Sequence, residues 1–323
     1  MKPTPSPELN ETLDRFRDEL FIPNSLKTNQ QNLIYKRSNA HKLNEYPIIV
    51  AIGEEEESYQ LRPLDKFALP TKQDSLRVLS LMAEANDWSN LATFLTGIYS
   101  GGQSLRLSQW EWLVRKAGGS KGLGALLMCA QQPESTHFRL KDLSLVERLF
   151  FELHHVGLRN DFKGKFVIKA SGLARSFALL MESPEHAVHD LEKDPKRSTL
   201  VIGTLLELSA ARALDMGGVD EGRVVEAYAR RLLAGWKNQD TVPEGQEWVA
   251  IDHLLQTIVP SYNGMKLALQ LNSIAGNKSI ASGLKTRTNE FGMLIANLKK
   301  MAPKQVQEKP TIGLQHAQRL HQA

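Results

Sequence analysis

The feature that most constrains this chain is the regular return of amphipathic helices from residue 74 onward. Apolar residues recur at intervals of three and four, as at Leu76, Leu79 and Met82, which is typical of a helix with one buried face. The first three helical hairpins begin near residues 74, 107 and 142, at intervals of 33 and 35 residues. Intervals of this length are typical of repeat proteins in which each hairpin buries its apolar face only against the next.

The later helices follow less regularly. A polar connector is expected over 183–197. Helical spacing predicts further helices over Phe166–Met181, Thr199–Leu214, Arg223–Trp236, Glu247–Val259, Met265–Ile274 and Thr288–Lys300.

The first 70 residues have a different pattern. Apolar residues between positions 9 and 20 predict one short amphipathic helix, whereas residues 23–45 are polar and are expected to be irregular. Residues 48–52 are β-branched and residues 58–62 alternate, which predicts a β-hairpin with an acidic tip at 54–57. A lone hairpin is marginally stable, so this one must pack against the helices.

These patterns together predict an all-α fold, an αα-hairpin repeat of the tetratricopeptide-like or pentatricopeptide-like solenoid kind, with a small N-terminal β-hairpin. Four domains are expected. They are an extended N-terminal segment with a short helix (1–45), the β-hairpin (46–70), an α-helical repeat domain (71–302) and a basic C-terminal tail (303–323).

Positive charge is concentrated at the C-terminal end. The net charge of the chain is +4, but residues 261–323 carry nine Lys and Arg against two Glu, a balance of +7. Such a segment is typical of proteins that contact a polyanion, with nucleic acid first and a membrane surface or an acidic protein as alternatives. A solvated charged face is the competing interpretation. The candidate nucleic-acid-binding residues are Lys36, Arg37, Lys42, Lys285, Arg287, Lys299, Lys300 and Lys304.

The sequence does not contain a recognisable catalytic motif. Cys129 is the single cysteine, which excludes an internal disulfide and a multi-cysteine metal site, and its apolar neighbours predict a core position. The glycine-rich stretch 118–124 lacks the Gly-Lys-Ser/Thr ending of a nucleotide-binding loop and is expected to be an inter-helix turn. His186 and His189 lie three apart beside carboxylates, but the charged surroundings favour a solvated turn over a metal site.

We therefore expect no enzymatic activity, no cofactor and no small-molecule substrate. An enzyme would require a deep pocket with carboxylates around His154, His155 or His186. No apolar run approaches the roughly 18 residues that a membrane span needs. The acidic first residues are unlike an organelle presequence, which leaves three alternatives: a cytoplasmic protein, internal targeting, or a leader that has been removed.

Several short motifs resemble a known group of proteins. They are Tyr59-Gln60-Leu61-Arg62-Pro63-Leu64-Asp65, Asp74-Ser75-Leu76, Asp87-Trp88, Trp110-Glu111-Trp112 and Leu205-Leu206-Glu207-Leu208. Together they resemble fungal mitochondrial helical-repeat proteins of the pentatricopeptide/tetratricopeptide-like kind, over about residues 46–237. Some members of that group are components of the mitochondrial ribosome or RNA-maintenance factors. No base-reading residue pair recurs at fixed repeat positions, which argues against sequence-specific RNA reading.

The resemblance and the charge pattern lead to one main hypothesis. The chain is expected to be a non-enzymatic mitochondrial protein that docks on a ribonucleoprotein assembly, most simply the ribosome, with ribosomal RNA and ribosomal proteins as partners. The alternative is a protein scaffold or assembly factor that makes no nucleic-acid contact. A near-neutral central body and the acidic hairpin tip favour that alternative.

Overall fold

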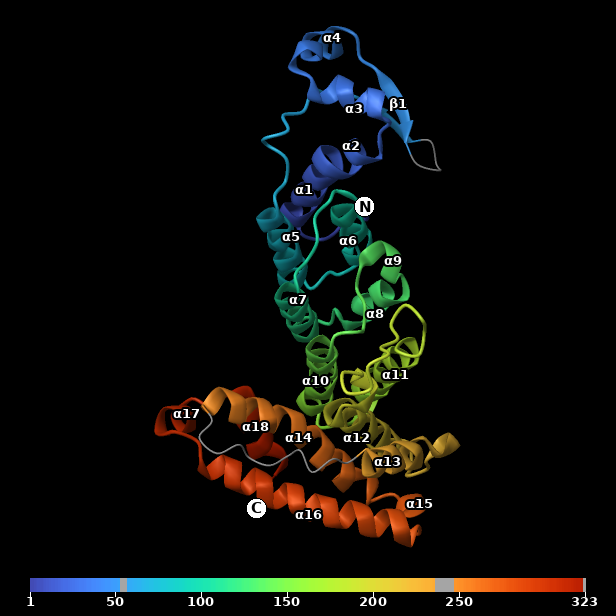
Figure 1. Cartoon of the computed structure of the whole chain (residues 1–323), viewed down its shortest axis with the longest axis vertical. Helices are drawn as coiled ribbons and strands as arrows, with labels where there is room; N and C mark the ends of the chain where they lie inside the picture. Colours follow the sequence, from blue (N-terminus) through green and yellow to red (C-terminus); the bar gives the residue numbers. More distant parts are fainter. Residues whose placement is uncertain (53–56, 236–246, 322–323) are drawn as a thin grey trace. The chain divides into compact units, whose positions relative to one another are not determined.

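The computed structural model describes residues 1–52, 57–235 and 247–321, and most of these residues are helical (Figure 1). An all-α architecture with one two-stranded sheet is thereby confirmed for the described residues. The chain divides into two compact units, Met1–Phe138 and Arg139–Ala323. The division falls inside the segment that the sequence predicted as one repeat domain.

The first unit contains, in chain order, α1 (Pro7–Phe16), the π-helical η1 (Arg17–Phe21), α2 (Ile22–Ser25), α3 (Thr28–Tyr35), the 3-10 turn η2 (Arg37–Asn39), α4 (Ala40–Glu45), β1 (Ile49–Ile52), β2 (Glu57–Gln60), α5 (Lys72–Glu84), α6 (Leu91–Ser100), α7 (Leu107–Gly119), α8 (Leu123–Gln131) and α9 (Pro133–Thr136). The second unit contains α10 (Leu143–Arg159), α11 (Gly164–Leu180), the 3-10 turn η3 (Pro195–Arg197), α12 (Thr199–Asp215), the 3-10 turn η4 (Glu221–Arg223), α13 (Val224–Ala234), α14 (Trp248–Ala268), α15 (Asn272–Ala275), α16 (Lys278–Lys300), α17 (Lys304–Glu308) and α18 (Ile312–Leu320).

Residues 23–45 differ from the sequence prediction, because they form helices where an irregular segment was expected. Their few apolar side chains converge on one small core, formed by Leu26, Ile34, Leu43 and Leu61. The burial of these widely spaced apolar residues stabilises the segment, although its overall composition is polar.

The predicted β-hairpin is present. β1 and β2 pair antiparallel, with Ile49 opposite Gln60 and Val50 opposite Tyr59. Val50 and Ile52 pack against the small core beside α3 and α4, so the hairpin packs against helices as expected. Residues 54–56 of the predicted acidic tip (54–57) lie outside the described residues.

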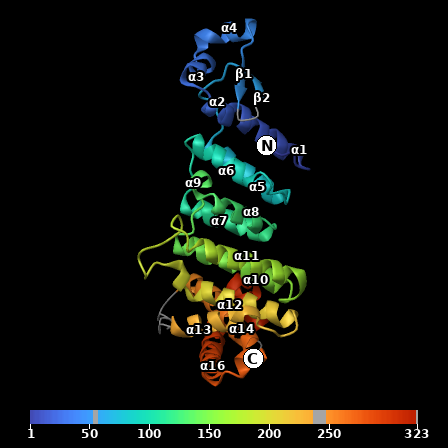
Figure 2. The same ribbon diagram turned by 90° about the vertical axis from the view of Figure 1, so that its right-hand side faces the viewer.

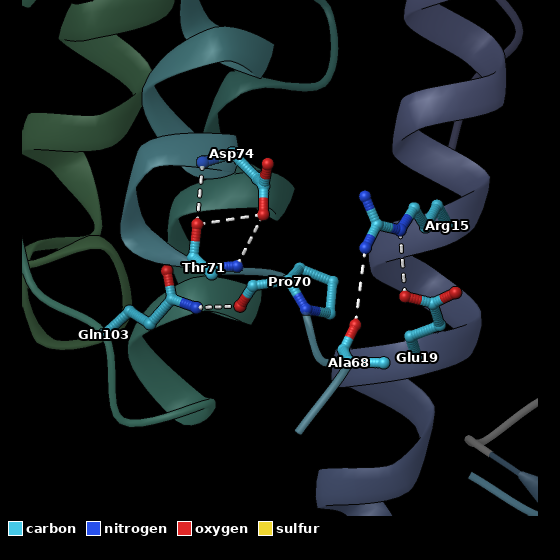
Figure 3. Close-up of polar contacts among 7 residues, drawn as sticks. All are labelled: Arg15, Glu19, Ala68, Pro70, Thr71, Asp74 and Gln103. Carbon is cyan, nitrogen blue, oxygen red and sulfur yellow. Dashed lines mark hydrogen bonds and ion pairs between the residues drawn. The ribbon is translucent and has the colours of Figure 1, made fainter. Parts of the chain in front are cut away.

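The segment between β2 and α5 is held from two sides, as Figure 3 shows. Arg15 of α1 donates to the Ala68 carbonyl oxygen at 3.4 Å, and Gln103 donates to the Pro70 carbonyl oxygen at 2.8 Å. These contacts deliver the chain to the first turn of α5 in a fixed position.

The N-cap of α5 is Thr71, and not Asp74 or Ser75 as the sequence predicted. The Thr71 Oγ1 accepts from the Asp74 backbone N–H at 3.3 Å, and the Asp74 carboxylate accepts from the Thr71 backbone N–H at 2.7 Å. This reciprocal arrangement is a capping box. The hydrogen bond from the Thr71 backbone is the main cause that lowers the pKa of Asp74 below its ordinary value.

Replacing Thr71 with alanine is expected to lower the free energy of unfolding by about 1 kcal/mol, because the Asp74 backbone N–H and the Asp74 carboxylate each lose their hydrogen bond to the Thr71 hydroxyl. Urea denaturation of the full chain measures this. Ser80→Ala in the same helix is the control, since Ser80 bonds only to the exposed Glu84, and its effect should stay within about 0.5 kcal/mol. Equal losses in the two variants would refute the capping role.

Helices α5 to α8 form two successive hairpins within the first unit. α5 contacts α7 and α6 contacts α8, and Figure 2 shows the two pairs as successive layers. Residues 120–122 form the turn between α7 and α8, within the stretch 118–124 where an inter-helix turn was predicted. Trp88 covers this turn, donating to the Ser120 carbonyl oxygen at 2.9 Å while its ring fills the space beside Gly122. Trp236, the last residue of the helix predicted over Arg223–Trp236, lies outside the described residues.

The second unit is built around α12, which contacts α10, α11, α13 and α14 (Figure 1). α14 differs from the sequence prediction, because Glu247–Val259 and Met265–Ile274 were expected to be separate helices. One helix instead continues through Pro260. A proline inside a helix costs about 3 kcal/mol, and here the dense burial of α14 against α12 offsets that cost.

The last two helices also depart from prediction. α16 begins at Lys278, ten residues before the predicted start at Thr288, and residues 303–323 contain α17 and α18 where a basic tail was expected. α18 packs on α14, with Leu314 and Ala317 buried. The Asp252 carboxylate of α14 accepts from the Leu314 backbone N–H at 3.1 Å. This contact fixes the first turn of α18.

Candidate nucleic-acid interface

Three of the predicted basic residues lie together in the first unit. Lys36 follows α3, Arg37 begins η2 and Lys42 lies in α4, and all three side chains are exposed. The small core beneath α3 and α4 holds this backbone in place. The arrangement presents three cations to solvent from one short stretch of structure.

Aromatic side chains lie in the same part of the chain, and the sequence analysis missed them. Lys66 places its Nζ 5.1 Å from the centroid of the Tyr35 ring. Tyr46 is 73% exposed and Phe67 is 93% exposed. Exposed aromatic rings beside cations suit single-stranded nucleic acid, because bases stack on the rings while phosphates meet the charges. We call Lys36, Arg37, Lys42, Tyr46, Lys66 and Phe67 the basic–aromatic set.

The second group of cations lies on α16. With 3.6 residues per turn, Lys278, Lys285 and Lys300 fall on one side of the helix, and all three are exposed. Lys285 and Lys300 are separated by about 22 Å along the axis at 1.5 Å per residue. Uncharged exposed residues complete this side, so no acidic residue interrupts it. We call Lys278, Ser282, Lys285, Asn289, Met293 and Lys300 the α16 face.

The remaining predicted residues differ in what they contact. Arg287 is paired with Glu290 at 2.6 Å, and Lys299 is half-buried with its Nζ donating to the His321 carbonyl oxygen at 2.9 Å. Lys304 is exposed at the first residue of α17. Thus Lys285, Lys300 and Lys304 offer their charge to solvent, whereas Arg287 and Lys299 also serve contacts within the second unit.

Two other residues that the sequence analysis considered, Cys129 and His186, lie in the protein interior. Burial raises the pKa of the Cys129 thiol to about 12, in agreement with the predicted core position. His186 is buried, contrary to the solvated turn predicted for it, and its Nδ1 accepts from the Leu140 backbone N–H at 3.1 Å. Within residues 1–52, 57–235 and 247–321, no three His, Cys, Asp or Glu side chains are grouped as a metal site requires.

His154 belongs to a buried polar network that the sequence analysis also missed. Its two ring nitrogens lie 2.6 Å from a Glu207 oxygen and 3.1 Å from His316 Nδ1. These partners are 53 and 162 residues away in the chain, so local sequence carries no signal of them. In the described part of the chain, no helix combines the length and apolar character that crossing a membrane requires.

Comparison with known proteins identifies the family. Residues 1–319 match the family model of mitochondrial ribosomal protein mS27. A curated relative, small ribosomal subunit protein mS27 of Neurospora crassa, is 23% identical over 255 residues, which cover 72% of this chain and 64% of the relative. The mitochondrial ribosomal resemblance noted in the sequence is thereby confirmed, together with its mitochondrial localisation. The chain belongs to the mitochondrial ribosomal protein mS27 family.

Proposed function

We propose that this protein is a non-enzymatic structural component of the small subunit of the mitochondrial ribosome, where it binds ribosomal RNA and neighbouring ribosomal proteins. The observation that carries the proposal is the family match over residues 1–319. The small-subunit assignment follows the name of the Neurospora crassa relative. The partners are inferred for this chain from the surfaces described above.

Two surfaces would meet RNA. The α16 face is a straight, exposed row with lysines at both ends, suited to successive phosphates of an RNA backbone. The basic–aromatic set adds rings on which unpaired bases can stack. Neither surface needs to read sequence, which agrees with the absence of a recurring base-reading pair.

The hairpins would meet proteins. α5, α7 and α10 begin 35 and 36 residues apart, which supports the proposal of a tetratricopeptide-like or pentatricopeptide-like repeat with a protein-binding surface. The limits at 45/46, 70/71 and 302/303 enter this proposal as divisions of role along the chain and not as limits of compact units, because the small core and the α14–α18 contact cross two of them.

Sedimentation of the native protein from gently lysed mitochondria tests the proposal. We expect the protein to migrate with the small ribosomal subunit and to leave that fraction after RNase digestion. Migration as a small species that RNase does not change would favour the scaffold or assembly factor and would refute ribosomal residence.

Charge reversal on the α16 face is expected to weaken RNA binding. In Lys285→Glu/Lys300→Glu, the affinity for ribosomal RNA should fall about tenfold to a hundredfold near 0.1 M salt, because two phosphate contacts are lost. The slope of log affinity against log salt should become shallower by about two. Filter binding across a salt series measures both quantities.

The matched control is Lys141→Glu/Lys193→Glu, which reverses two exposed lysines outside both proposed RNA surfaces. The control has the same change in net charge, so it separates local contacts from general electrostatic attraction. Equal losses in the two double variants would remove the α16 face from the mechanism.

A further inference from the structure

Two polar groups in the interior of the second unit lack a hydrogen-bond partner among the described residues. One is the Oγ of Ser171 on α11, a residue only 1% exposed, and the other is the Nε of Arg212 on α12. A buried donor without a partner costs about 1 to 3 kcal/mol. Groups of this kind often mark a place where a ligand or ordered water completes the hydrogen bonding.

The two residues that carry these groups, Ser171 and Arg212, line the same cavity. It has a volume of about 50 Å³, is partly open to solvent, and lies between α11, α12 and the residues leading into α13. Ser171 and Arg175 lie four apart on α11, and Ser209 and Arg212 lie three apart on α12, so each helix turns one hydroxyl and one guanidinium toward it. A space of this size takes a few water-sized groups, which is the size of one tetrahedral oxyanion.

The charge balance of the cavity favours an anion. Of the two acidic residues in its lining, Asp220 already accepts from the backbone N–H groups of Val225 and Glu226, both at 3.0 Å. Glu221 is 75% exposed and lies 3.9 Å from Arg212, a separation at the limit of an ion pair. Arg175 is exposed and Arg212 is only at the limit of an ion pair, so neither guanidinium is saturated by these carboxylates.

We propose that Ser171, Arg175, Ser209 and Arg212 form a binding site for a phosphate group. The planar guanidinium donors match the oxygens of phosphate in pairs, and the two hydroxyls supply further donors from the floor. The site goes beyond the proposed function, because it contains none of the residues of the basic–aromatic set or the α16 face.

A larger groove adjoins the cavity and can accommodate the rest of a ligand whose phosphate group lies in the cavity. Its volume is about 320 Å³, and Arg175 and Val224 line both spaces. Leu179 and Tyr228 give the groove an apolar wall suited to a sugar or base. The phosphate can therefore be a phosphodiester of RNA or the end group of a phosphate monoester.

Binding to the purified full-length protein tests the site. Isothermal titration with inorganic phosphate at constant ionic strength should show saturable binding to the wild type. In Arg175→Gln and in Arg212→Gln the affinity should fall about tenfold, because each change removes charge-assisted hydrogen bonds. Ser171→Ala keeps both charges and should weaken binding less than either arginine variant.

The control is Arg230→Gln, which removes an exposed arginine of α13 that pairs with Glu226 outside the cavity. It should bind phosphate as the wild type does. A dinucleoside monophosphate, which carries only a phosphodiester, separates the two ligand sources. Its binding assigns the site to an RNA backbone, and binding of inorganic phosphate alone assigns it to a phosphate monoester.

Two results would overturn the proposal. One is an absence of saturable phosphate binding to the wild type while circular dichroism shows it folded. The other is equal affinity in the wild type and in both arginine variants. Neither result depends on ribosome association, so the outcome is independent of the proposed function.

Discussion

Gly264→Val is expected to destabilise the second unit by about 3 kcal/mol or more, because no side chain fits where α12 and α14 cross. A Cβ at Gly264 would lie 2.9 Å from the backbone nitrogen of Glu207 and 2.9 Å from the carbonyl oxygen of Gly203. Both neighbours are backbone atoms of α12 and cannot rotate away. Relief requires the two helices to separate, which opens the core around them.

The same crossing is equally close on the α12 side. A Cβ at Gly203 would lie 2.8 Å from the Cα of Ser261, and the Ser261 hydroxyl is itself fixed by donation to the Thr199 carbonyl oxygen at 3.0 Å. Small residues on both helices thus allow their backbones to touch. This is the contact on which the core of the second unit is assembled.

Gly172→Val in α11 is the matched control. Gly172 is exposed in the middle of a helix, and a Cβ there would meet no atom within 4 Å. The substitution should change stability by less than about 0.5 kcal/mol or increase it, since glycine is a poor helix former. Urea unfolding of both variants, followed by circular dichroism, makes the comparison. Similar losses in the two would show that the α12–α14 crossing can accommodate a side chain.

The sequence predicted most helices of the fold because their signals are local. The hairpin starts expected near 74, 107 and 142 are found at 72, 107 and 143. Apolar residues at helical intervals, separated by glycine pairs, suffice for that result. The boundary errors are of the kind that an unrecognised cap produces, as at Thr71.

The sequence could not predict features that depend on tertiary packing. Two helices were predicted over Glu247–Val259 and Met265–Ile274, yet α14 continues through the buried Pro260 and Gly264, because tertiary contact overrides local preference. Residues 23–45 appeared too polar to fold because their core residues are far apart in the chain. The candidate basic residues were found by charge alone, whereas their pairing, as at Arg287 and Lys299, required the structure.

Glu207→Ala is expected to lower the free energy of unfolding by about 3 to 5 kcal/mol, because it leaves two buried polar groups without partners. Asn263 donates its Nδ2–H to one Glu207 oxygen at 2.7 Å, and His154 Nδ1 lies 2.6 Å from the other. His154 then continues the network to His316 of α18. The network joins α10, α12, α14 and α18, so its loss should also loosen α18.

The network is expected to be uncharged at neutral pH. Burial raises the pKa of Glu207 well above its ordinary value. Burial, reinforced by neighbouring histidines, lowers the pKa of His154 to about 3 and that of His316 to about 2, with Arg319 and Arg159 also contributing at His316. A protonated Glu207 donates to His154 Nδ1, and the His154 Nε2–H donates to His316 Nδ1. Every donor in this network then has an acceptor, and no member of the network carries a charge.

Glu207→Gln tests this protonation state, because a glutamine amide copies the hydrogen bonds of a neutral carboxylic acid. Its carbonyl oxygen can accept from Asn263 and its amide N–H can donate to His154. We expect Glu207→Gln to be much closer to the wild type in stability than Glu207→Ala. A glutamine as damaging as the alanine would show that Glu207 is ionised in the folded protein.

The stability difference between Glu207→Gln and the wild type is also expected to change with pH, in a direction that depends on whether Glu207 is protonated. Between about pH 4.5 and 6.5 the two histidines are protonated only when unfolded, so their contribution to stability falls as the pH falls. Burial raises the pKa of Glu207, so above about pH 4.5 it holds its proton more tightly when folded, and its contribution falls as the pH rises. Removing the carboxylic acid leaves the histidine effect unopposed. The free energy of unfolding of Glu207→Gln should therefore rise with pH, relative to the wild type, by up to about 1.4 kcal/mol per pH unit. Urea titrations at pH 5.0 and 6.0 measure that difference, and a constant difference would mean that Glu207 is charged in the core.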